Sequence, residues 1–399
     1  MEPSKTFFEV LQPVWWISLV SFLVALIITP VCRWVAYRTR IVDRPDDLLK
    51  PHVRAVAYLG GVAMFLGMAA GLVGYVIAMP DRDVHLGELA AQLTGWQTWA
   101  LLHNPMWNVI AIALSSLVIM LVGLVDDIRC LTPRAKVLGQ VMAAAILLAG
   151  GVGERMSVVI FDSMDWVVPE YVVVSVSGLM CFMMVIATCN AVNLIDGLDG
   201  LCGGVTGIIT VGFLALATFL AMWCWPGRQD IDSLRVGLCL AMVGAVLGFL
   251  PYNIPPASIF MGDAGSMLLG FFVAMMMALF CKEGNPRWFL SACAVFTLPM
   301  LDTSLAVVRR LLAGKSIFAG NRSHLYDQLV DRGMTVKQVV VLFYALAATV
   351  AALGFALALI RVRYAIGIYL LVIAVAWGIF AFTGMVRPPP KTSAAKPKD

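Results

Sequence analysis

Five aspartates lie in three short connections between apolar stretches of the sequence: Asp126 and Asp127, Asp196 and Asp199, and Asp263. Carboxylates beside apolar helices are poorly solvated, and they repel one another unless a cation lies among them. The sequence shows no adequate basic partner for these acids. All-oxygen ligation suits Mg²⁺ or Mn²⁺, and substrate phosphates can complete the metal's coordination shell. We therefore expect a divalent metal site, although any one of these aspartates alone would be read as a solvated loop charge.

The segment Asn190-Ala-Val-Asn-Leu-Ile-Asp-Gly-Leu-Asp-Gly-Leu201 concentrates polar groups at one of these connections. Its amides and acids recur at three-residue steps, so on a helical turn they would share one face. These residues are Asn190, Asn193, Asp196 and Asp199. The two glycines permit positive φ angles and a close approach of the backbone to a ligand. We expect this face to bind a ligand.

The segment Phe260-Met-Gly-Asp-Ala-Gly-Ser266 repeats the theme, with Asp263 between two glycines at a predicted helix start. Free N–H groups at a helix start suit a phosphate. Further along, Asp302 lies inside an apolar stretch, and an ionisable residue at membrane depth is a functional candidate. Arg309 follows seven residues later, about 20° away on the same helical face. A structural ion pair or a cap explains Asp302 as well as a substrate contact does.

The elements that must position these residues are transmembrane helices. The chain has 399 residues, 61% hydrophobic and 13% charged, against roughly 45–50% and 25% in soluble domains. This composition excludes a large soluble domain, a disulfide scaffold and a nucleic-acid-binding surface. A helix needs roughly 20 apolar residues to cross a bilayer, and we find eleven such stretches, at 12–35, 57–79, 106–125, 136–152, 170–189, 203–224, 236–252, 265–281, 288–311, 339–360 and 364–386.

The sequence thus predicts an all-α polytopic membrane protein with eleven transmembrane helices. Residues 1–386 would form one catalytic domain, and residues 387–399 a disordered tail. Lys and Arg gather in the loops 36–56, 126–135 and 312–338 and in the tail, which predicts a cytoplasmic C-terminus and an outside N-terminus. All five aspartates then lie at the cytoplasmic face. We read the scattered cysteines as packing residues, and likewise the glycine pairs Gly67/Gly71 and Gly244/Gly248.

Together these segments resemble the polyprenyl-phosphate N-acetylhexosamine-1-phosphate transferases. This is glycosyltransferase family 4, with the WecA-like enzymes and, more distantly, MraY. The matching pieces cover residues 43 to 324 in family order, and the eleven-span count agrees with the WecA-like branch. They are Asp43-Arg-Pro, Lys50-Pro-His52, Tyr58-Leu-Gly-Gly61, Gly123-Leu-Val-Asp-Asp127, Asn190 to Leu201, Phe260 to Ser266, and Leu301-Asp-Thr303 leading to Arg309-Arg310 and His324.

The resemblance implies transfer of a sugar 1-phosphate from a UDP-sugar to undecaprenyl phosphate, with release of UMP. The reaction would start cell-surface polysaccharide synthesis at the cytoplasmic face of the bacterial inner membrane. The resemblance implies Mg²⁺, or Mn²⁺, on Asp263 and Asn193, and catalytic roles for Asp126 and Asp127 on the lipid phosphate. That phosphate is already ionised near neutral pH, so positioning explains these acids as well as base catalysis does. The implied substrate contacts are Asp199 and Phe260 to uracil, Arg310 to the diphosphate, and Asn190, Asp196, His324 and Lys50.

The chain departs from the family where WecA-like enzymes carry a His-x-His-His cluster, because here the sequence reads His324-Leu-Tyr-Asp327. The replacements at Tyr326 and Asp327 are expected to affect the choice among GlcNAc, GalNAc and their epimers. We expect UDP-GlcNAc as donor, with an MraY-type phospho-MurNAc-pentapeptide transferase as the alternative. A transporter would need acids along a path through the bilayer. An intramembrane aspartyl protease would need a second spanning aspartate, and a prenyltransferase a third acid after Asp127. The sequence leaves room for a homodimer.

Overall fold

The computed structural model describes residues 3–43, 55–79, 82–95, 98–223, 229–281, 285–314, 316 and 324–387. The substrate contact expected at Lys50 and the tail beyond Arg387 lie outside the described residues. The elements in chain order are α1 (Phe7–Leu11), α2 (Trp16–Thr39), β1 (Val42–Asp43), β2 (Val56–Ala57), α3 (Gly60–Ala78), α4 (Arg82–Thr94), α5 (Thr98–Leu102), α6 (Pro105–Arg129), α7 (Pro133–Ala149), α8 (Val158–Ser163), α9 (Glu170–Ile195), α10 (Leu201–Met222), α11 (Gln229–Asn253), α12 (Gly262–Cys281), α13 (Pro286–Val295), α14 (Thr297–Leu312), α15 (Leu325–Asp331), α16 (Val336–Ala358) and α17 (Val362–Phe382).

Long apolar helices make up most of the described chain, which confirms the prediction of an all-α polytopic membrane protein. Nine of them could cross a membrane, namely α2, α3, α6, α9, α10, α11, α12, α16 and α17, and the bent pair α13–α14 would be a tenth. Each of the eleven predicted stretches overlaps one of these elements or α7. With 17 residues, α7 is about 25 Å long, which is shorter than a bilayer core of roughly 30 Å. Among the described residues, the structure therefore supports nine or ten spans.

The ninth predicted span, 288–311, is not one straight helix. Helices α13 and α14 meet at Phe296 with a bend of 66°. Pro299 lies in the first turn of α14 and has no backbone N–H, and its ring would clash with the carbonyl of Val295 in a continuous helix. Val295 is the last residue of α13, so the break falls where the proline requires it. The bend directs α14 toward α9, against which it packs.

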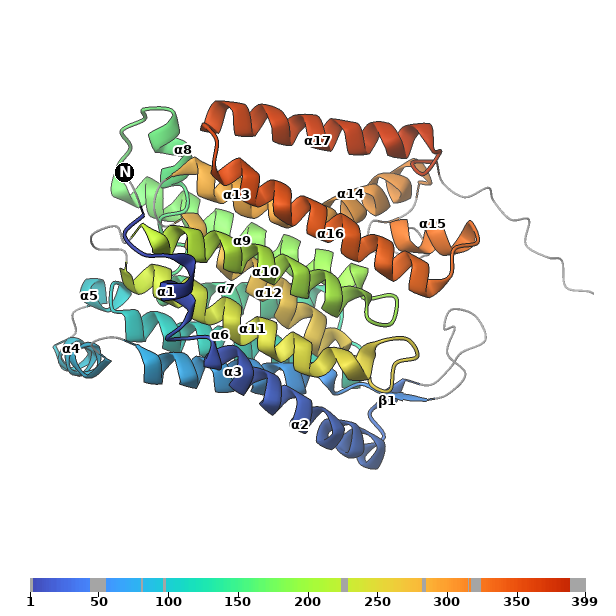
Figure 1. Cartoon of the computed structure of the whole chain (residues 1–399), viewed down its shortest axis with the longest axis horizontal. Helices are drawn as coiled ribbons and strands as arrows, with labels where there is room; N and C mark the ends of the chain where they lie inside the picture. Colours follow the sequence, from blue (N-terminus) through green and yellow to red (C-terminus); the bar gives the residue numbers. More distant parts are fainter. Residues whose placement is uncertain are drawn as a thin grey trace, which may run out of the picture.

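Helix α12 is the centre of the bundle. All of its apolar window is buried inside the protein, and it packs against α6, α9, α3 and α13. Helix α17 is peripheral, with only 11% of its window buried, and Figure 1 shows it along one edge of the bundle. The start of α12 is thus held by several helices at once, which allows the polar residues there to be placed with little freedom.

The paired glycines allow close helix packing, as predicted. A Cβ atom on Gly244 would lie 2.1 Å from the carbonyl oxygen of Ser18, and one on Gly248 would lie 2.4 Å from that of Phe22, both on α2. On α3, a Cβ atom on Gly71 would lie 2.2 Å from the Ser21 hydroxyl. Helices α2, α3 and α11 therefore pack at backbone contact. The cysteines that the structure describes are free thiols, most of them buried in the same packing.

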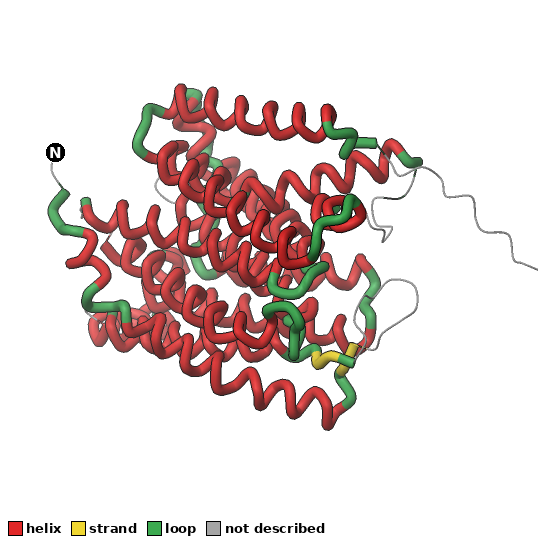
Figure 2. The backbone as a smooth tube through the Cα atoms, turned by 45° about the vertical axis from the view of Figure 1, so that its right-hand side comes forward, coloured by secondary structure: helices red, strands yellow, loops and turns green. Residues whose placement is uncertain are grey.

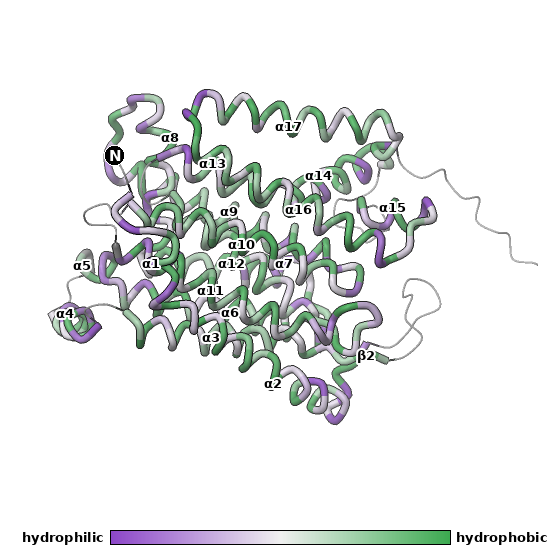
Figure 3. Tube along the Cα trace, viewed as in Figure 1, coloured by the Kyte–Doolittle hydropathy of each residue, from purple (hydrophilic) through white to green (hydrophobic). Residues whose placement is uncertain are grey.

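The polar residues gather at the two ends of the bundle, as the hydropathy colours in Figure 3 show. Figure 1 places α1, α4, α5 and α8 at one end, and β1 and α15 at the other. Strands β1 and β2 form an antiparallel pair, and Ala57 bridges to Ile259 just before α12. In Figure 2 this small sheet lies beside several of the connecting loops. The end that carries the sheet is the end that carries the acidic residues; its cytoplasmic location stays a prediction from the charge distribution.

Candidate active site

Asp127 joins the end of α6 to the start of α12. Its carboxylate accepts hydrogen bonds from the backbone amides of Asp263, at 2.7 Å, and Ala264, at 3.1 Å. The helix start that we expected to offer free N–H groups to a phosphate is therefore capped by a carboxylate from another helix. Gly262 has a φ of 67°, and a Cβ atom there would lie 2.4 Å from the Asp127 carboxylate, so this cap requires the glycine of the Met-Gly-Asp sequence.

Gly123, the first residue of the Gly-Leu-Val-Asp-Asp motif, is required by the close packing of α6 on the start of α12. It lies one helical turn before Asp127 on the same face of α6, and a Cβ atom there would come within 2.4 Å of the Asp263 carbonyl oxygen. The motif Tyr58-Leu-Gly-Gly61 acts similarly from α3, since the amides of Gly60 and Gly61 donate to the carbonyls of Phe260 and Met261. Two glycine motifs far apart in the sequence thus hold the chain around Asp263 from both sides.

Lys136 is the basic partner that the sequence argument did not identify. Its ammonium group, in the first turn of α7, donates a hydrogen bond of 2.6 Å to Asp263 and forms a short ion pair with Asp126. The Asp126 side chain is buried, with 7% of the residue exposed. Its carboxylate also accepts a hydrogen bond from the backbone amide of Leu131 at 2.6 Å, which fixes the turn between α6 and α7. The statement that these acids lack a basic partner is therefore wrong for Asp126 and Asp263. A helix that begins at Pro133 places Lys136 in its first turn, close in sequence to Asp126, but nothing in that pattern points to Asp263.

Asn193 completes the surroundings of Asp263. Its amide nitrogen donates to Asp263 at 2.8 Å and to the Ser266 hydroxyl at 2.9 Å. Asn190, one turn earlier on α9, donates to Gln140 and to the Ile186 carbonyl, so its amide nitrogen serves the packing of α9 on α7. Of the two amides expected to contact ligands, Asn193 is the one that lies against the acidic cluster.

Asp196 and Asp199 follow α9 without continuing it. The helix ends at Ile195, and Asp196 has non-helical angles, so the four polar residues of this segment do not share one helical face. Asp199 accepts the backbone amide of Ala257 at 2.9 Å, which ties this loop to the segment before α12. Burial raises the pKa of the Asp196 carboxyl group well above its ordinary value, and the negative charges of Asp263, Asp127 and Asp199 add to this increase. Asp196 is therefore held more readily in its protonated form than an ordinary aspartate.

Phe260 packs at the edge of the cluster against Tyr58, with ring centroids 5.9 Å apart. Its backbone amide donates to Ala57 of strand β2 at 2.8 Å. Burial, and then the charges of Asp43, Asp127 and Asp196, raise the pKa of the Tyr58 hydroxyl. An aromatic pair thus lies beside the acids.

A second polar group comes from α14 and α15. Asp302 is fully buried. Its carboxylate accepts hydrogen bonds from His324 Nδ1 at 2.8 Å and from the backbone amide of Leu325 at 2.6 Å. Arg310 Nη2 lies 3.4 Å from His324 Nε2. The carboxylate of Asp302 therefore caps α15 and holds His324. Most of the loop that leads into His324, including Ser323, lies outside the described residues.

Tyr326 links this second group to α9. Its hydroxyl donates to the Leu194 carbonyl at 3.1 Å, and its ring stacks on His324 with centroids 5.5 Å apart. A Cβ atom on Gly197 would lie 2.2 Å from the Tyr326 hydroxyl, so Gly197 makes room for this side chain. The sequence predicts that Tyr326 affects the choice of sugar, and the structure buries this side chain, with 6% of its surface exposed.

The predicted magnesium site would need Asp263 and Asn193 as ligands, with substrate completing the coordination shell. Among the described residues, no group of three or more His, Cys, Asp or Glu side chains is arranged to hold a metal ion. The Asp263 carboxylate lies against the Asn193 side chain, whose amide nitrogen donates to it at 2.8 Å, so Asn193 would have to turn its amide oxygen toward Asp263 to bind a metal there. Mg²⁺ is commonly held by one or two carboxylates together with substrate phosphates and water. The present partner of the Asp263 carboxylate, the Lys136 ammonium group, is itself a cation.

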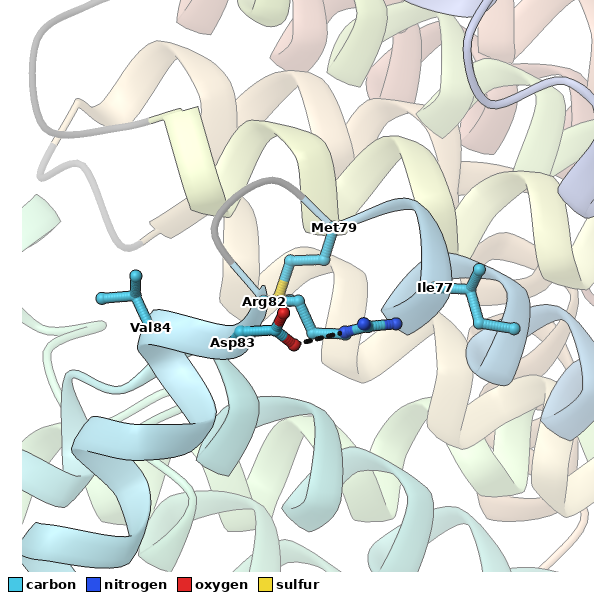
Figure 4. Close-up of a pocket in the computed structure, with 5 residues that line it drawn as sticks. All are labelled: Ile77, Met79, Arg82, Asp83 and Val84. Atoms are coloured by element: carbon cyan, nitrogen blue, oxygen red, sulfur yellow. Dashed lines mark hydrogen bonds and ion pairs between the residues drawn. The ribbon is translucent and has the colours of Figure 1, made fainter.

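A pocket of about 380 Å³ lies at the opposite end of the bundle. Figure 4 shows it at the junction of α3 and α4, where Arg82 donates to Asp83 at 3.1 Å and Ile77, Met79 and Val84 supply the remaining lining. Its distance from the acidic cluster separates it from the candidate active site.

The fold and the site together define an integral membrane protein with a largely half-buried cluster of acids, amides and basic side chains at one end of its helix bundle. Residues 109–281 match the family described as glycosyl transferase family 4. The chain is similar to the probable undecaprenyl-phosphate N-acetylglucosaminyl 1-phosphate transferase of Bacillus subtilis, with 29% identity over 82% of this chain and 80% of the relative. It is 31% identical to the decaprenyl-phosphate N-acetylglucosaminephosphotransferase of Mycobacterium tuberculosis, over 82% of this chain and 78% of the relative.

A third relative, the phospho-N-acetylmuramoyl-pentapeptide-transferase of Desulforudis audaxviator, is 30% identical over 84% of this chain and 96% of its own length. The chain therefore belongs to glycosyl transferase family 4, as the resemblance of its motifs predicted, and it is a polyprenyl-phosphate sugar-phosphate transferase. The apolar helices and the bacterial relatives make it a multi-pass protein of the bacterial inner membrane.

Proposed function

We propose that this protein transfers N-acetylglucosamine 1-phosphate from UDP-N-acetylglucosamine to undecaprenyl phosphate. The observation that carries the proposal is the grouping of Asp126, Lys136, Asp263 and Asn193 at one end of the bundle. A polar site at the membrane face suits a reaction that joins a water-soluble nucleotide sugar to a lipid. The names of the similar N-acetylglucosamine phosphotransferases support this choice of donor.

In the proposed reaction, an oxygen of the lipid phosphate attacks the β-phosphorus of the nucleotide sugar. A bond forms between that oxygen and the β-phosphorus, the bond from the β-phosphorus to the bridging oxygen breaks, and UMP leaves. The proton balance needs little help, because the attacking phosphate is already ionised near neutral pH. The protein's task is therefore to bring two anions together and to hold them in line.

Each residue of the cluster has a proposed part in that task. Asp263 and Asn193 would hold Mg²⁺, which supplies positive charge to the diphosphate. Lys136 and Arg310 would offset the charge of the two substrates, and Asp126 would orient Lys136. Asp127 would keep Asp263 in place through the backbone, as a capping residue rather than a base. Phe260 would provide an apolar face for the uracil.

The other residues that the sequence predicts to contact substrate have supporting roles in this proposal. Asp196 would present a carboxyl group near the uracil and ribose, and Asp199 would hold the loop that carries Phe260. Asn190 would support Asn193 from the preceding turn, and His324 would hold Arg310. Lys50 stays a predicted contact to substrate.

The test is a transfer assay with the purified full chain in detergent. We expect labelled sugar phosphate to pass from UDP-N-acetylglucosamine to undecaprenyl phosphate with release of UMP, and EDTA to stop the reaction. Asp263→Asn should abolish transfer in a protein that still folds and inserts. Asn285→Ser is the matched control, because Asn285 caps α13 at the far end of α12 and serine retains a capping oxygen. Full turnover in EDTA would reject the metal, and no transfer from any UDP-sugar would reject the function.

A second donor follows from one comparison. The relative from Desulforudis audaxviator, whose name specifies N-acetylmuramoyl-pentapeptide phosphate transfer, aligns over nearly all of its own length. UDP-MurNAc-pentapeptide is therefore included as a competing donor in the same assay. The homodimer remains a proposal that the mass of the detergent-solubilised protein would decide.

A further inference from the structure

The imidazole of His324 is held on three sides by buried groups. Asp302 accepts from Nδ1 at 2.8 Å, Arg310 Nη2 lies 3.4 Å from Nε2, and the ring of Tyr326 is stacked on the imidazole at an interplanar angle of 10°. His324 is 3% exposed, Arg310 5% and Asp302 fully buried. The imidazole therefore has a fixed position, and its proton distribution is set by its two polar neighbours.

These neighbours determine which nitrogen carries the proton. A carboxylate can only accept, so the His324 Nδ1 atom that faces Asp302 must be the donor. A guanidinium can only donate, so the Nε2 atom that faces Arg310 must be the acceptor. Both conditions are met by the neutral Nδ1–H tautomer, and the three side chains then form a directed chain from Arg310 through His324 to Asp302.

We propose that Asp302 is a positioning residue for Arg310 and that it acts through His324. Asp302 holds the proton of His324 on Nδ1. The Nε2 atom of His324 can then accept a hydrogen bond from Arg310, and this bond fixes one nitrogen of the guanidinium. The inference rests on the proposed function at one point, that Arg310 meets the diphosphate of the nucleotide sugar. It gives the buried Asp302 a part in donor binding although it does not touch the donor.

The second hydrogen bond of Asp302 makes this proposal testable. One of its oxygens accepts His324 Nδ1, and the other accepts the backbone amide of Leu325 at 2.6 Å. In an Asp302→Asn variant, one side of the group becomes an NH₂ donor. The backbone N–H cannot become an acceptor, whereas the imidazole can change tautomer, so the Asn oxygen will face Leu325 and the NH₂ will face His324.

His324 must then carry its proton on Nε2 and direct it at Arg310. Two donors then face each other, and the guanidinium loses the acceptor that His324 Nε2 provided. The fold around α15 is retained, because the Leu325 amide keeps its acceptor and the Tyr326 hydroxyl keeps the Leu194 carbonyl. The substitution thus separates tautomer control from capping of the helix.

The first measurement is the ¹⁵N spectrum of the histidine side chains in the full-length protein in detergent. The chain has only 4 histidines, and a His324→Gln sample identifies the signal of interest. We expect Nδ1 of His324 to be protonated in the wild type and Nε2 in Asp302→Asn. A wild-type His324 protonated on Nε2, or one unchanged by the substitution, would overturn the proposal.

The second measurement is the steady-state rate with each substrate. Misplacing a binding group by about 1 Å can cost about 100-fold, so kcat/KM for the UDP-sugar should fall about 100-fold in Asp302→Asn while KM for undecaprenyl phosphate is unchanged. Ser304→Ala is the control, because Ser304 donates to the Leu301 carbonyl of its own helix. In a His324→Gln background, Asp302→Asn should cost little more, since the effect passes through the imidazole.

The two measurements test different claims, so the proposed function and the positioning inference can be rejected independently of each other. If the wild type transfers no sugar phosphate, the proposed function is wrong, and the spectrum still decides how Asp302 controls His324. If the wild type is active and Asp302→Asn changes kcat/KM equally in the presence and absence of His324, the positioning inference is wrong and the proposed function stands.

Discussion

Lys136 donates a hydrogen bond of 2.6 Å from its ammonium group to the carboxylate of Asp263. The same ammonium group pairs with Asp126, so one cation bridges two acids from two different helices. The proposed magnesium ion would share Asp263 with Lys136. A metal and a lysine at one carboxylate compete for its oxygens, and the balance between them can be measured.

Replacing Lys136 should make the folded protein depend on the metal. In Lys136→Met, Asp126 and Asp263 lose their shared cation, and a metal that binds only the folded protein stabilises it by RT ln(1 + [L]/Kd). We expect the increase in Tm on adding Mg²⁺ to be larger in Lys136→Met than in the wild type. Melting curves in detergent with Mg²⁺ and with EDTA measure this. Equal shifts in the two proteins would argue against a metal at Asp263.

Asp127 should behave as a cap and not as a base. Asp127→Ala leaves the amides of Asp263 and Ala264 without their acceptor, at about 1–3 kcal/mol for each buried group, so its Tm should fall. Asp127→Asn keeps one acceptor oxygen and should show an intermediate Tm with measurable activity. The comparison uses melting curves together with transfer rates. An Asp127→Asn protein that melts like the wild type and is inactive would restore the catalytic role predicted from the sequence.

The sequence could predict the parts of this protein that depend on composition and short motifs. Hydropathy placed the apolar helices, and the glycine and aspartate motifs identified the segments that meet at Asp263. It could not predict that Asp127 caps α12 or that Lys136 faces Asp263, because those contacts join helices far apart in the sequence. Nor could it find the link from Asp302 to His324, since a helical pattern compares residues within one helix and suggested Arg309 instead.

Protonation of Asp196 should appear as a pH dependence of stability. Its pKa is raised in the folded protein, so the folded state holds a proton that the unfolded chain releases at an ordinary value of about 4. The resulting stabilisation is complete below that ordinary pKa and is lost as the pH rises through the raised one. The wild type should thus lose Tm, relative to Asp196→Asn, with increasing pH. Parallel melting curves from acid to alkaline pH would contradict this.

The two ends of the bundle should face different compartments. The native thiol of Cys130 is exposed in the turn between α6 and α7, beside Asp126. We expect it to react with an impermeant thiol reagent only after the cells are opened. In a Cys130→Ser background, a cysteine replacing Asp83, whose side chain is 85% exposed, should react in intact cells. The reverse labelling pattern would place the acidic cluster outside and would remove access to cytoplasmic UDP-sugars.

The donor should be a small UDP-N-acetylhexosamine. A site that hydrogen-bonds a substrate group can reject an analogue lacking it by about 10⁴-fold, so UDP-N-acetylglucosamine should be used far better than UDP-glucose. Each donor is tested in turn with undecaprenyl phosphate. Efficient use of UDP-MurNAc-pentapeptide with none of UDP-N-acetylglucosamine would move the protein to the phospho-MurNAc-pentapeptide branch of the family.

Tyr326 should not decide which epimer is used, contrary to what its place in the sequence suggests. Its hydroxyl is bound to the Leu194 carbonyl and its ring is covered by His324 and Phe343, so no free donor points at a sugar. Tyr326→Phe should therefore lower Tm, because it leaves a carbonyl without its partner, while the ratio of rates with UDP-N-acetylglucosamine and UDP-N-acetylgalactosamine stays as in the wild type. A changed ratio with an unchanged Tm would mean that Tyr326 turns toward the sugar when the donor binds.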